Sequence, residues 1–244
     1  MSTDFTVSNQ LVRFANELDF AERDALKFSI SVAAVKELEN DFAISEDLEK
    51  RARFSKFLHY LLLIQPFRAR VPEYGLAYLG RPPFMTQALL KALQNEAVNL
   101  RPQARVNFEQ YIVTVDTPND ASLCEQLANS EEMHNLMSLY AGPCTPSFIS
   151  SYIYYEHAGQ RSSPHVDNAF TSLTAMIGIR HEYPGAIEQS SASVVYWPNK
   201  PPLEYRLRPG EIAIFFGVCA VHGRYPVQNG ETVHSLLLSF QPKM

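Results

Sequence analysis

The chain has 244 residues, of which 46% are apolar and 19% are charged, so it can bury a sizeable core and is not a disordered protein. Its formal net charge of −5 argues against a protein whose main task is to grip a nucleic-acid backbone. The three cysteines, Cys124, Cys144 and Cys219, match no metal or redox spacing and cannot form a complete disulfide framework.

The N-terminus carries no recognisable targeting or membrane signal. Its first ten residues include Asp4 and lack the apolar segment of a signal peptide. The longest apolar run, residues 61–64, is far shorter than the roughly 20 residues that a membrane helix needs. We therefore expect a cytoplasmic protein that makes no membrane contact.

The first hundred residues have the composition and spacing of helices. Residues 7–65 are rich in Ala, Leu, Glu, Lys and Phe, and Ser45-Glu46-Asp47 is a typical helix start. Pro66 should end that helix, because proline cannot continue one. Residues 67–84 contain several prolines and glycines and predict an irregular connection, and residues 85–97 predict another helix.

From Val106 onward, short strand patterns alternate with turn signals. One helix or two fit between them at residues 119–141. The alternation of short strands with turns is typical of a sandwich, jelly roll or barrel. We expect a single α+β domain over residues 1–244, with a mainly helical layer (1–100) packed on a double-sheet core (105–242). The predicted strands cover residues 106–115, 147–156, 171–180, 193–197, 203–208, 211–216, 219–225 and 233–240.

One segment carries the residue types of a metal site. Residues i and i+2 of a strand point to the same side, so His165 and Asp167 can direct a nitrogen and a carboxylate oxygen at one point. His222 follows a second apolar strand and can supply the third ligand. Two histidines and one carboxylate on one face of an octahedron are the ligand set of non-haem Fe(II) oxygenases.

The surrounding motifs resemble the Fe(II)- and 2-oxoglutarate-dependent dioxygenase superfamily. The resemblance is carried by Tyr155 before His165-Val166-Asp167-Asn168, by Arg208-Pro209-Gly210-Glu211 before an apolar strand, and by His222-Gly223-Arg224-Tyr225-Pro226-Val227 with Asn229-Gly230-Glu231. It covers residues 105–242 and implies a double-stranded β-helix (jelly-roll, cupin-like) core. It also implies an enzyme with His165, Asp167 and His222 on Fe(II), which consumes 2-oxoglutarate and O2 and most often acts as a hydroxylase.

The residue that would anchor the distal carboxylate of 2-oxoglutarate departs from the family pattern. Many members place a basic residue where this chain has Thr232, and His234 lies next on the same strand face. In other branches the anchor lies at the spacing of Arg180, which by alternation shares a face with Gly178, Met176 and Thr174. Arg224, two residues past His222, also faces the interior by alternation. Tyr155 matches a cosubstrate-binding tyrosine of some prolyl hydroxylases. Cosubstrate binding therefore stays open among Arg180, Arg224, Tyr155, Thr232 and His234.

The substrate is the least determined part of this interpretation. We expect a small molecule, such as an amino acid or a metabolite intermediate, and an extra interior arginine such as Arg224 or Arg161 would suit a carboxylated one. Alternatives are a peptide or protein hydroxylase, a cupin-like metalloenzyme that does not use 2-oxoglutarate, and a non-catalytic barrel. Nucleic acid is disfavoured by the charge, and a homodimer stays open.

Overall fold

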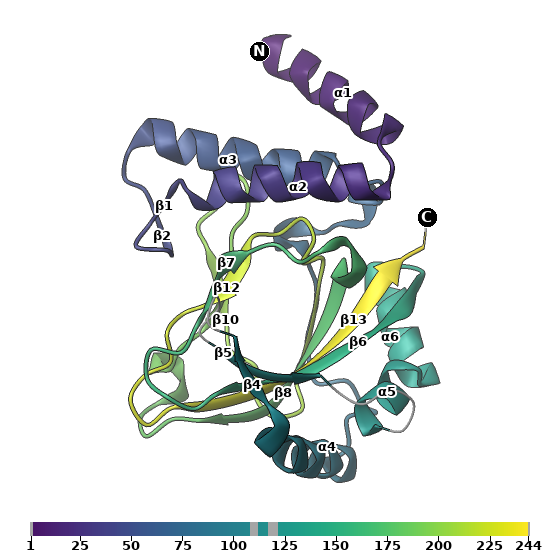
Figure 1. Ribbon diagram of the computed structural model, residues 1–244, viewed down its shortest axis with the longest axis vertical. Helices are drawn as coiled ribbons and strands as arrows, with labels where there is room; N and C mark the ends of the chain where they lie inside the picture. The colour runs from purple at the N-terminus through teal and green to yellow at the C-terminus, as the bar shows by residue number, and fades with distance from the viewer. Residues whose placement is uncertain (1, 108–111, 117–121, 244) are drawn as a thin grey trace.

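A computed structural model describes residues 2–107, 112–116 and 122–243 (Figure 1). The helices are α1 (Ser2–Glu17), α2 (Phe20–Val35), α3 (Leu48–Leu63), α4 (Gln87–Leu100), α5 (Leu123–Ala128) and α6 (Glu131–Ala141). The strands are β1 (Leu38–Glu39), β2 (Ala43–Ile44), β3 (Leu76–Gly80), β4 (Arg105–Asn107), β5 (Ile112–Asp116), β6 (Cys144–Tyr155), β7 (Ser162–His165), β8 (Leu173–Glu182), β9 (Ser193–Val195), β10 (Leu203–Tyr205), β11 (Ile212–Phe215), β12 (His222–Arg224) and β13 (Thr232–Pro242).

Two antiparallel sheets form the body of the protein. The larger has seven strands in the order β3-β11-β8-β13-β6-β5-β4, and the smaller has four in the order β10-β9-β12-β7. Together their strands form a ring, which is seen nearly end on in Figure 1. This is the expected α+β class with a double-stranded β-helix core.

The larger sheet separates two environments. Alternate residues of β8 and β13 point outward, among them Ala175, Ile177 and Leu236, and pack with α4, α5 and α6 in the largest apolar cluster. Of the residues between them, Met176 lines the cavity inside the ring, and the hydroxyl of Thr174 donates to Asp167, which lines the same cavity. Alternation therefore gives one sheet a dry outer face and a cavity-lining inner face.

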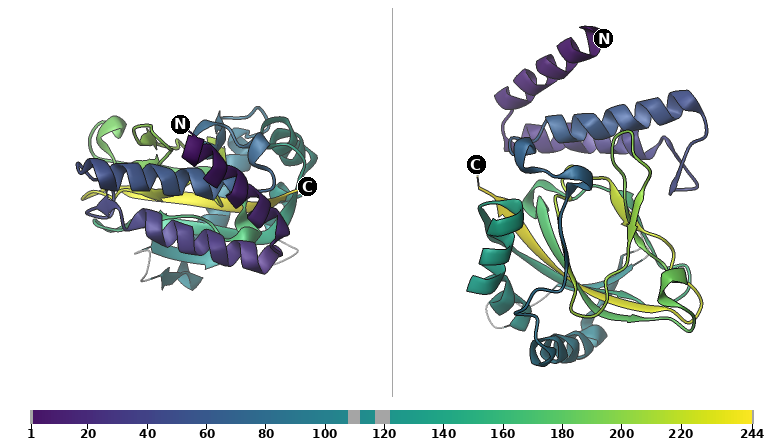
Figure 2. Two further views of the ribbon diagram at one scale, coloured as in Figure 1. Left: turned by 90° about the horizontal axis from the view of Figure 1, so that it is seen from above. Right: turned by 180° about the vertical axis from the view of Figure 1, so that it is seen from behind.

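The helices α2 and α3 lie side by side above the ring of strands (Figures 1 and 2). Asp47 caps α3 by accepting hydrogen bonds from the backbone N–H groups of Glu49 and Lys50, and Pro66 follows the end of the helix, as the sequence predicts. Apolar side chains of α3, including Phe54 and Leu61, pack with the smaller sheet. Among the described residues, no helix is long and apolar enough to cross a bilayer.

Some predicted elements need correction. The connection predicted as irregular contains β3, which pairs with β11 at the edge of the larger sheet, so the first hundred residues contribute a strand as well as helices. The strand predicted over 106–115 is two paired strands, β4 and β5, and residues 108–111 lie outside the described residues. Both α5 and α6 occur within 119–141, of which residues 119–121 are not described.

Candidate metal centre

The three predicted metal ligands converge at one end of the smaller sheet. His165 ends β7 and His222 begins β12, and the two residues face each other as paired positions of neighbouring strands. Asp167 follows β7, and its Oδ1 lies 3.8 Å from Nε2 of His165 and 3.6 Å from Nε2 of His222. One donor atom from each residue lies within 4.8 Å of the others. This is the set of two histidines and one carboxylate that the sequence predicts.

Backbone carbonyls orient both imidazole rings for metal binding. Nδ1 of His165 lies 2.7 Å from the carbonyl oxygen of Ser163, and Nδ1 of His222 lies 2.8 Å from that of Ala220. A carbonyl can only accept, so each Nδ1 carries a proton, and Nε2 is the ring atom of each histidine that can bind a metal. Burial, followed by the proximity of His222, lowers the pKa of His165 to about 4 and keeps the ring neutral near pH 7. The donor set therefore fits a divalent transition metal.

The carboxylate of Asp167 is held from two sides. The backbone N–H of Asp167 donates to the carbonyl of Gly217 at 2.9 Å, and the hydroxyl of Thr174 donates to Oδ2 at 3.0 Å. Gly217 lies so close that a Cβ atom at this position would overlap Oδ2. The missing side chain of Gly217 thus makes room for the carboxylate, while Thr174 leaves Oδ1 directed at the histidines.

A cavity of about 890 Å³ opens over the triad, between the inner faces of the two sheets and α2. Its lining includes Tyr155 and Arg224 as well as the three ligands. Arg224 is 6% exposed, and its guanidinium carbon lies 5.4 Å from the centroid of the Tyr155 ring. Burial raises the pKa of Tyr155 to about 12 although the charge of Arg224 opposes this rise, so the phenol stays protonated. The interior position that alternation predicts for Arg224 is confirmed.

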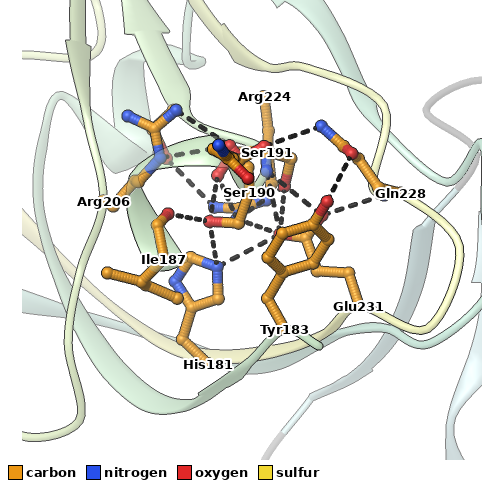
Figure 3. A network of polar contacts seen from close by, with 11 residues as sticks. His181, Tyr183, Ile187, Ser190, Ser191, Arg206, Arg224, Gln228 and Glu231 are labelled. Atoms are coloured by element: carbon orange, nitrogen blue, oxygen red, sulfur yellow. Dashed lines mark hydrogen bonds and ion pairs between the residues drawn. The ribbon is translucent and has the colours of Figure 1, made fainter. Parts of the chain in front are cut away.

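A buried polar network positions Arg224 (Figure 3). Its Nη2 donates to the hydroxyl of Ser191 at 2.9 Å and lies 3.6 Å from Oε1 of Glu231. Burial alone would raise the pKa of Glu231, but hydrogen bonds from His181, Ser191 and the backbone N–H of Gln228 lower it to about 2. Glu231 is therefore a fixed negative charge behind Arg224. The Nε of Arg224 is buried and has no hydrogen-bond partner among the described residues.

Arg180, predicted as one possible anchor, lies outside the cavity. Ser235 pairs with Gly178 and His234 with Arg180, so β8 carries one extra residue, Ile179, at a β-bulge. Past a bulge the alternation of faces is inverted. Arg180 is therefore exposed and pairs with Glu182 at 2.6 Å, so the expectation that it shares the inner face with Gly178, Met176 and Thr174 is wrong.

The other two candidates on β13 also point away from the metal ligands. Nε2 of His234 lies 3.0 Å from Oε1 of Glu156, and its ring contacts that of Tyr154 on the outer face of the larger sheet. Thr232 pairs with Glu182 near the end of β8. Neither His234 nor Thr232 lines the cavity, whose β13 residues are Ser235 and Leu237.

The structure brings α2 to the site, which sequence reasoning missed. Lys27 is buried, and its Nζ donates to the main-chain carbonyl of Asp167 at 2.6 Å and pairs with Asp24 at 2.6 Å. Phe20 and Phe28 lie on the same side of the helix and line the cavity. Positions 20, 24, 27 and 28 have the spacing of one helix face, but the sequence does not indicate what that face meets.

Comparisons with known proteins identify the fold. No protein-family model and no curated protein matches the sequence. Among solved structures, the non-haem α-ketoglutarate-dependent epimerase SnoN from nogalamycin biosynthesis is 17% identical, with a TM-score of 0.57 over 76% of this chain and 82% of that one. A prolyl-4-hydroxylase from Pseudomonas putida is 14% identical, with a TM-score of 0.54 over 70% and 94%.

A third similar structure is HygX from Streptomyces hygroscopicus, solved with nickel, 2-oxoglutarate and hygromycin B bound. It is 9% identical, with a TM-score of 0.52 over 70% of this chain and 84% of that one. These proteins share the arrangement of sheets found here at low sequence identity. The chain thus has the double-stranded β-helix fold of the Fe(II)- and 2-oxoglutarate-dependent oxygenases.

Proposed function

We propose that this protein is a non-haem oxygenase that uses Fe(II), 2-oxoglutarate and O2 to hydroxylate, or otherwise oxidise, an unactivated C–H group of a small molecule. The observation that carries the proposal is that Nε2 of two histidines and one carboxylate oxygen converge in a cavity that also contains a buried arginine. The fold shared with oxygenases of this kind supports it.

His165, Asp167 and His222 would hold the iron. Iron(II), together with 2-oxoglutarate and O2, supplies the oxidising power for C–H cleavage when bound. The protein contributes orientation: two backbone carbonyls fix the rings, and Thr174 with Gly217 fixes the carboxylate. The presence of Asp167 also favours hydroxylation over halogenation, because halogenating relatives lack a carboxylate at this position.

Arg224 is the residue we assign to the distal carboxylate of 2-oxoglutarate. It lines the same cavity as the metal ligands, and its Nε–H has no protein partner among the described residues. A guanidinium can bind a carboxylate through two parallel hydrogen bonds. Tyr155, which stays protonated beside Arg224, can donate a further one. Arg180 is less suitable, because it is exposed and already paired with Glu182.

Two solved structures support a small-molecule substrate rather than a macromolecule. SnoN was solved with nogalamycin RO and HygX with hygromycin B. In this protein, α2 lies over the cavity and contacts the loop of Asp167 through Lys27. That contact also supports the view that residues 1–244 form a single domain.

An anaerobic titration tests the proposal. Fe(II) and then 2-oxoglutarate are added to metal-free protein while visible absorption is recorded. We expect a charge-transfer band only when both are present, its loss in His222→Ala, and its retention in His157→Ala, a matched change of an exposed histidine. Iron binding without a band would instead indicate a metalloenzyme that does not use 2-oxoglutarate. No iron binding at all would favour a non-catalytic barrel.

A further inference from the structure

We propose that the substrate is a neutral molecule with a bulky apolar, ring-containing body, and that the aromatic face of α2 recognises it. This inference rests on the proposed function and names the substrate class of that same site. It is carried by three properties of the cavity: its charges, its exposed aromatic rings and its volume.

The charges of the cavity wall are already matched. Among the described lining residues, the charged side chains are Asp24, Lys27, Asp167 and Arg224. Asp167 belongs to the metal set, and Arg224 faces Glu231 and the proposed cosubstrate site. Asp24 and Lys27 neutralise each other at 2.6 Å, and only 5% of the Lys27 side chain is exposed. No described lining charge is left over for the substrate.

A charged substrate would therefore lose its hydration without gaining a counter-ion. Desolvating an unpaired ion is strongly unfavourable, so a free amino acid, with two charges, fits this wall poorly. This finding disfavours the amino acid that the sequence suggests. It also removes the reason for a carboxylated substrate, since Arg161 pairs with Asp41 at 3.0 Å and does not line the cavity.

Aromatic rings are exposed where α2 meets the cavity. Phe20, Phe28 and Phe170 line the cavity, yet 52%, 65% and 56% of their surfaces are exposed. The rings of Phe20 and Phe170 lie 5.3 Å apart and join α2 to the turn that follows the loop of Asp167. Grouped exposed apolar side chains beside a polar site mark a surface that binds a partner. Aromatic faces of this kind suit flat or ring-shaped apolar groups.

The cavity is larger than the cosubstrate and an amino acid require. The roughly ten non-hydrogen atoms of 2-oxoglutarate fill at most about 300 Å³, if each takes the ~30 Å³ of a water molecule in the liquid. Out of about 890 Å³, the remainder admits a molecule of the size of a drug or polycyclic natural product. The wall also carries neutral polar side chains, among them Thr114, Ser151 and Asn168.

A matched pair of fluorescent probes tests the inference. N-phenyl-1-naphthylamine is neutral, and 8-anilino-1-naphthalenesulfonate has the same aromatic body with one negative charge. Each is titrated anaerobically into protein with Fe(II) and 2-oxoglutarate, so that the Arg224 site is filled. We expect the neutral probe to bind at least about tenfold more tightly, which corresponds to about 1.4 kcal/mol. Equal or tighter binding of the sulfonate would overturn the inference.

Variants locate the bound probe. Ala25 is an exposed α2 residue that lines the cavity, so Ala25→Trp should block the cavity without disturbing the fold. Phe28→Ala should weaken binding of the neutral probe about fivefold or more, as loss of a contacting ring implies. Phe14→Ala is the control, because Phe14 is 51% exposed on α1 and does not line the cavity. Unchanged binding in Ala25→Trp and Phe28→Ala would overturn the inference.

The same samples separate this inference from the proposed function. If the charge-transfer band forms but the neutral probe does not bind in the cavity, the substrate class is wrong and the oxygenase assignment stands. If the band is absent but the neutral probe binds and Ala25→Trp abolishes its binding, the apolar ligand class stands and the oxygenase assignment is wrong.

Discussion

Replacing Arg224 gives the sharpest test of how this protein would hold 2-oxoglutarate. Arg224→Leu removes the guanidinium but keeps an apolar side chain against the ring of Tyr155. Glu231 loses an ion-pair partner at 3.6 Å, yet it keeps hydrogen bonds from Ser191, His181 and the backbone of Gln228. The buried carboxylate therefore stays satisfied, and we expect the variant to fold.

The expected loss follows from the contacts that Arg224 can make. Its Nε–H has no partner within the part of the chain that the structure describes, and its Nη1 makes one long hydrogen bond, 3.4 Å to the hydroxyl of Ser193. Hydrogen bonds to a charged group contribute about 1.5–3 kcal/mol. Losing that interaction should weaken 2-oxoglutarate binding by about 10- to 150-fold. Arg224→Lys keeps the positive charge without the planar guanidinium. Its affinity for 2-oxoglutarate should lie between those of the parent protein and Arg224→Leu.

The assay is the dissociation constant of 2-oxoglutarate, read from the charge-transfer band of the anaerobic iron complex. Arg180→Leu is the matched control, because Arg180 is exposed, pairs with Glu182 and lies past the bulge of β8. We expect its dissociation constant to stay within about twofold of the parent value, as for a surface ion pair. A large loss in Arg180→Leu with none in Arg224→Leu would refute the assignment. Melting temperatures of both variants show whether a loss reflects unfolding.

Three further predictions concern the metal ligands. Gly217→Ala places a Cβ against Oδ2 of Asp167 and should weaken Fe(II) binding about 10- to 100-fold in a metal titration; unchanged affinity would contradict the packing described above. Thr174→Val removes the 3.0 Å hydrogen bond to Asp167 and should weaken Fe(II) about tenfold, whereas Thr174→Ser should not. The pKa of His165 is lower in the folded protein than its ordinary 6.5, so the unfolded chain binds this proton first as the pH falls from 6.5 toward 4. The free energy of unfolding of the metal-free protein, measured in urea, should therefore be lower at about pH 5 than at about pH 7.5. His165→Gln should reduce this difference. A difference in the variant as large as that in the parent protein would contradict the lowered pKa of His165.

The metal ligands were predictable because their signal is local. His165 and Asp167 are two positions apart beside a short strand, and the apolar strand before His222 places that residue opposite them. Alternation also predicted that Arg224 faces the same interior as His222. These inferences needed only the period of a strand and the pairing of two neighbours, which residue types reveal.

The side of β8 on which Arg180 lies was not predictable in the same way. Alternation from Thr174 holds as far as Gly178, and then one unpaired residue, Ile179, inverts it. Because of this inversion His181 instead reaches Glu231 behind Arg224, and Arg180 becomes a surface residue. A bulge depends on the register that two strands adopt. Gly178, directly before Ile179, is the one sign of it in the sequence, but a glycine within a strand equally marks a close backbone approach.

The role of α2 depends on a contact between residues 140 positions apart, so its sequence pattern alone could not reveal it. Phe20 and Phe28 line the cavity and are not among the metal ligands, so their replacement should change substrate recognition rather than iron binding. Lys27 differs, because its Nζ binds the carbonyl of Asp167 while it neutralises Asp24 on the cavity wall. A change at Lys27 would therefore disturb the carboxylate ligand and also leave a bare charge facing the substrate. If α2 recognises the substrate as proposed, the buried amine of Lys27 would join that recognition to the metal site.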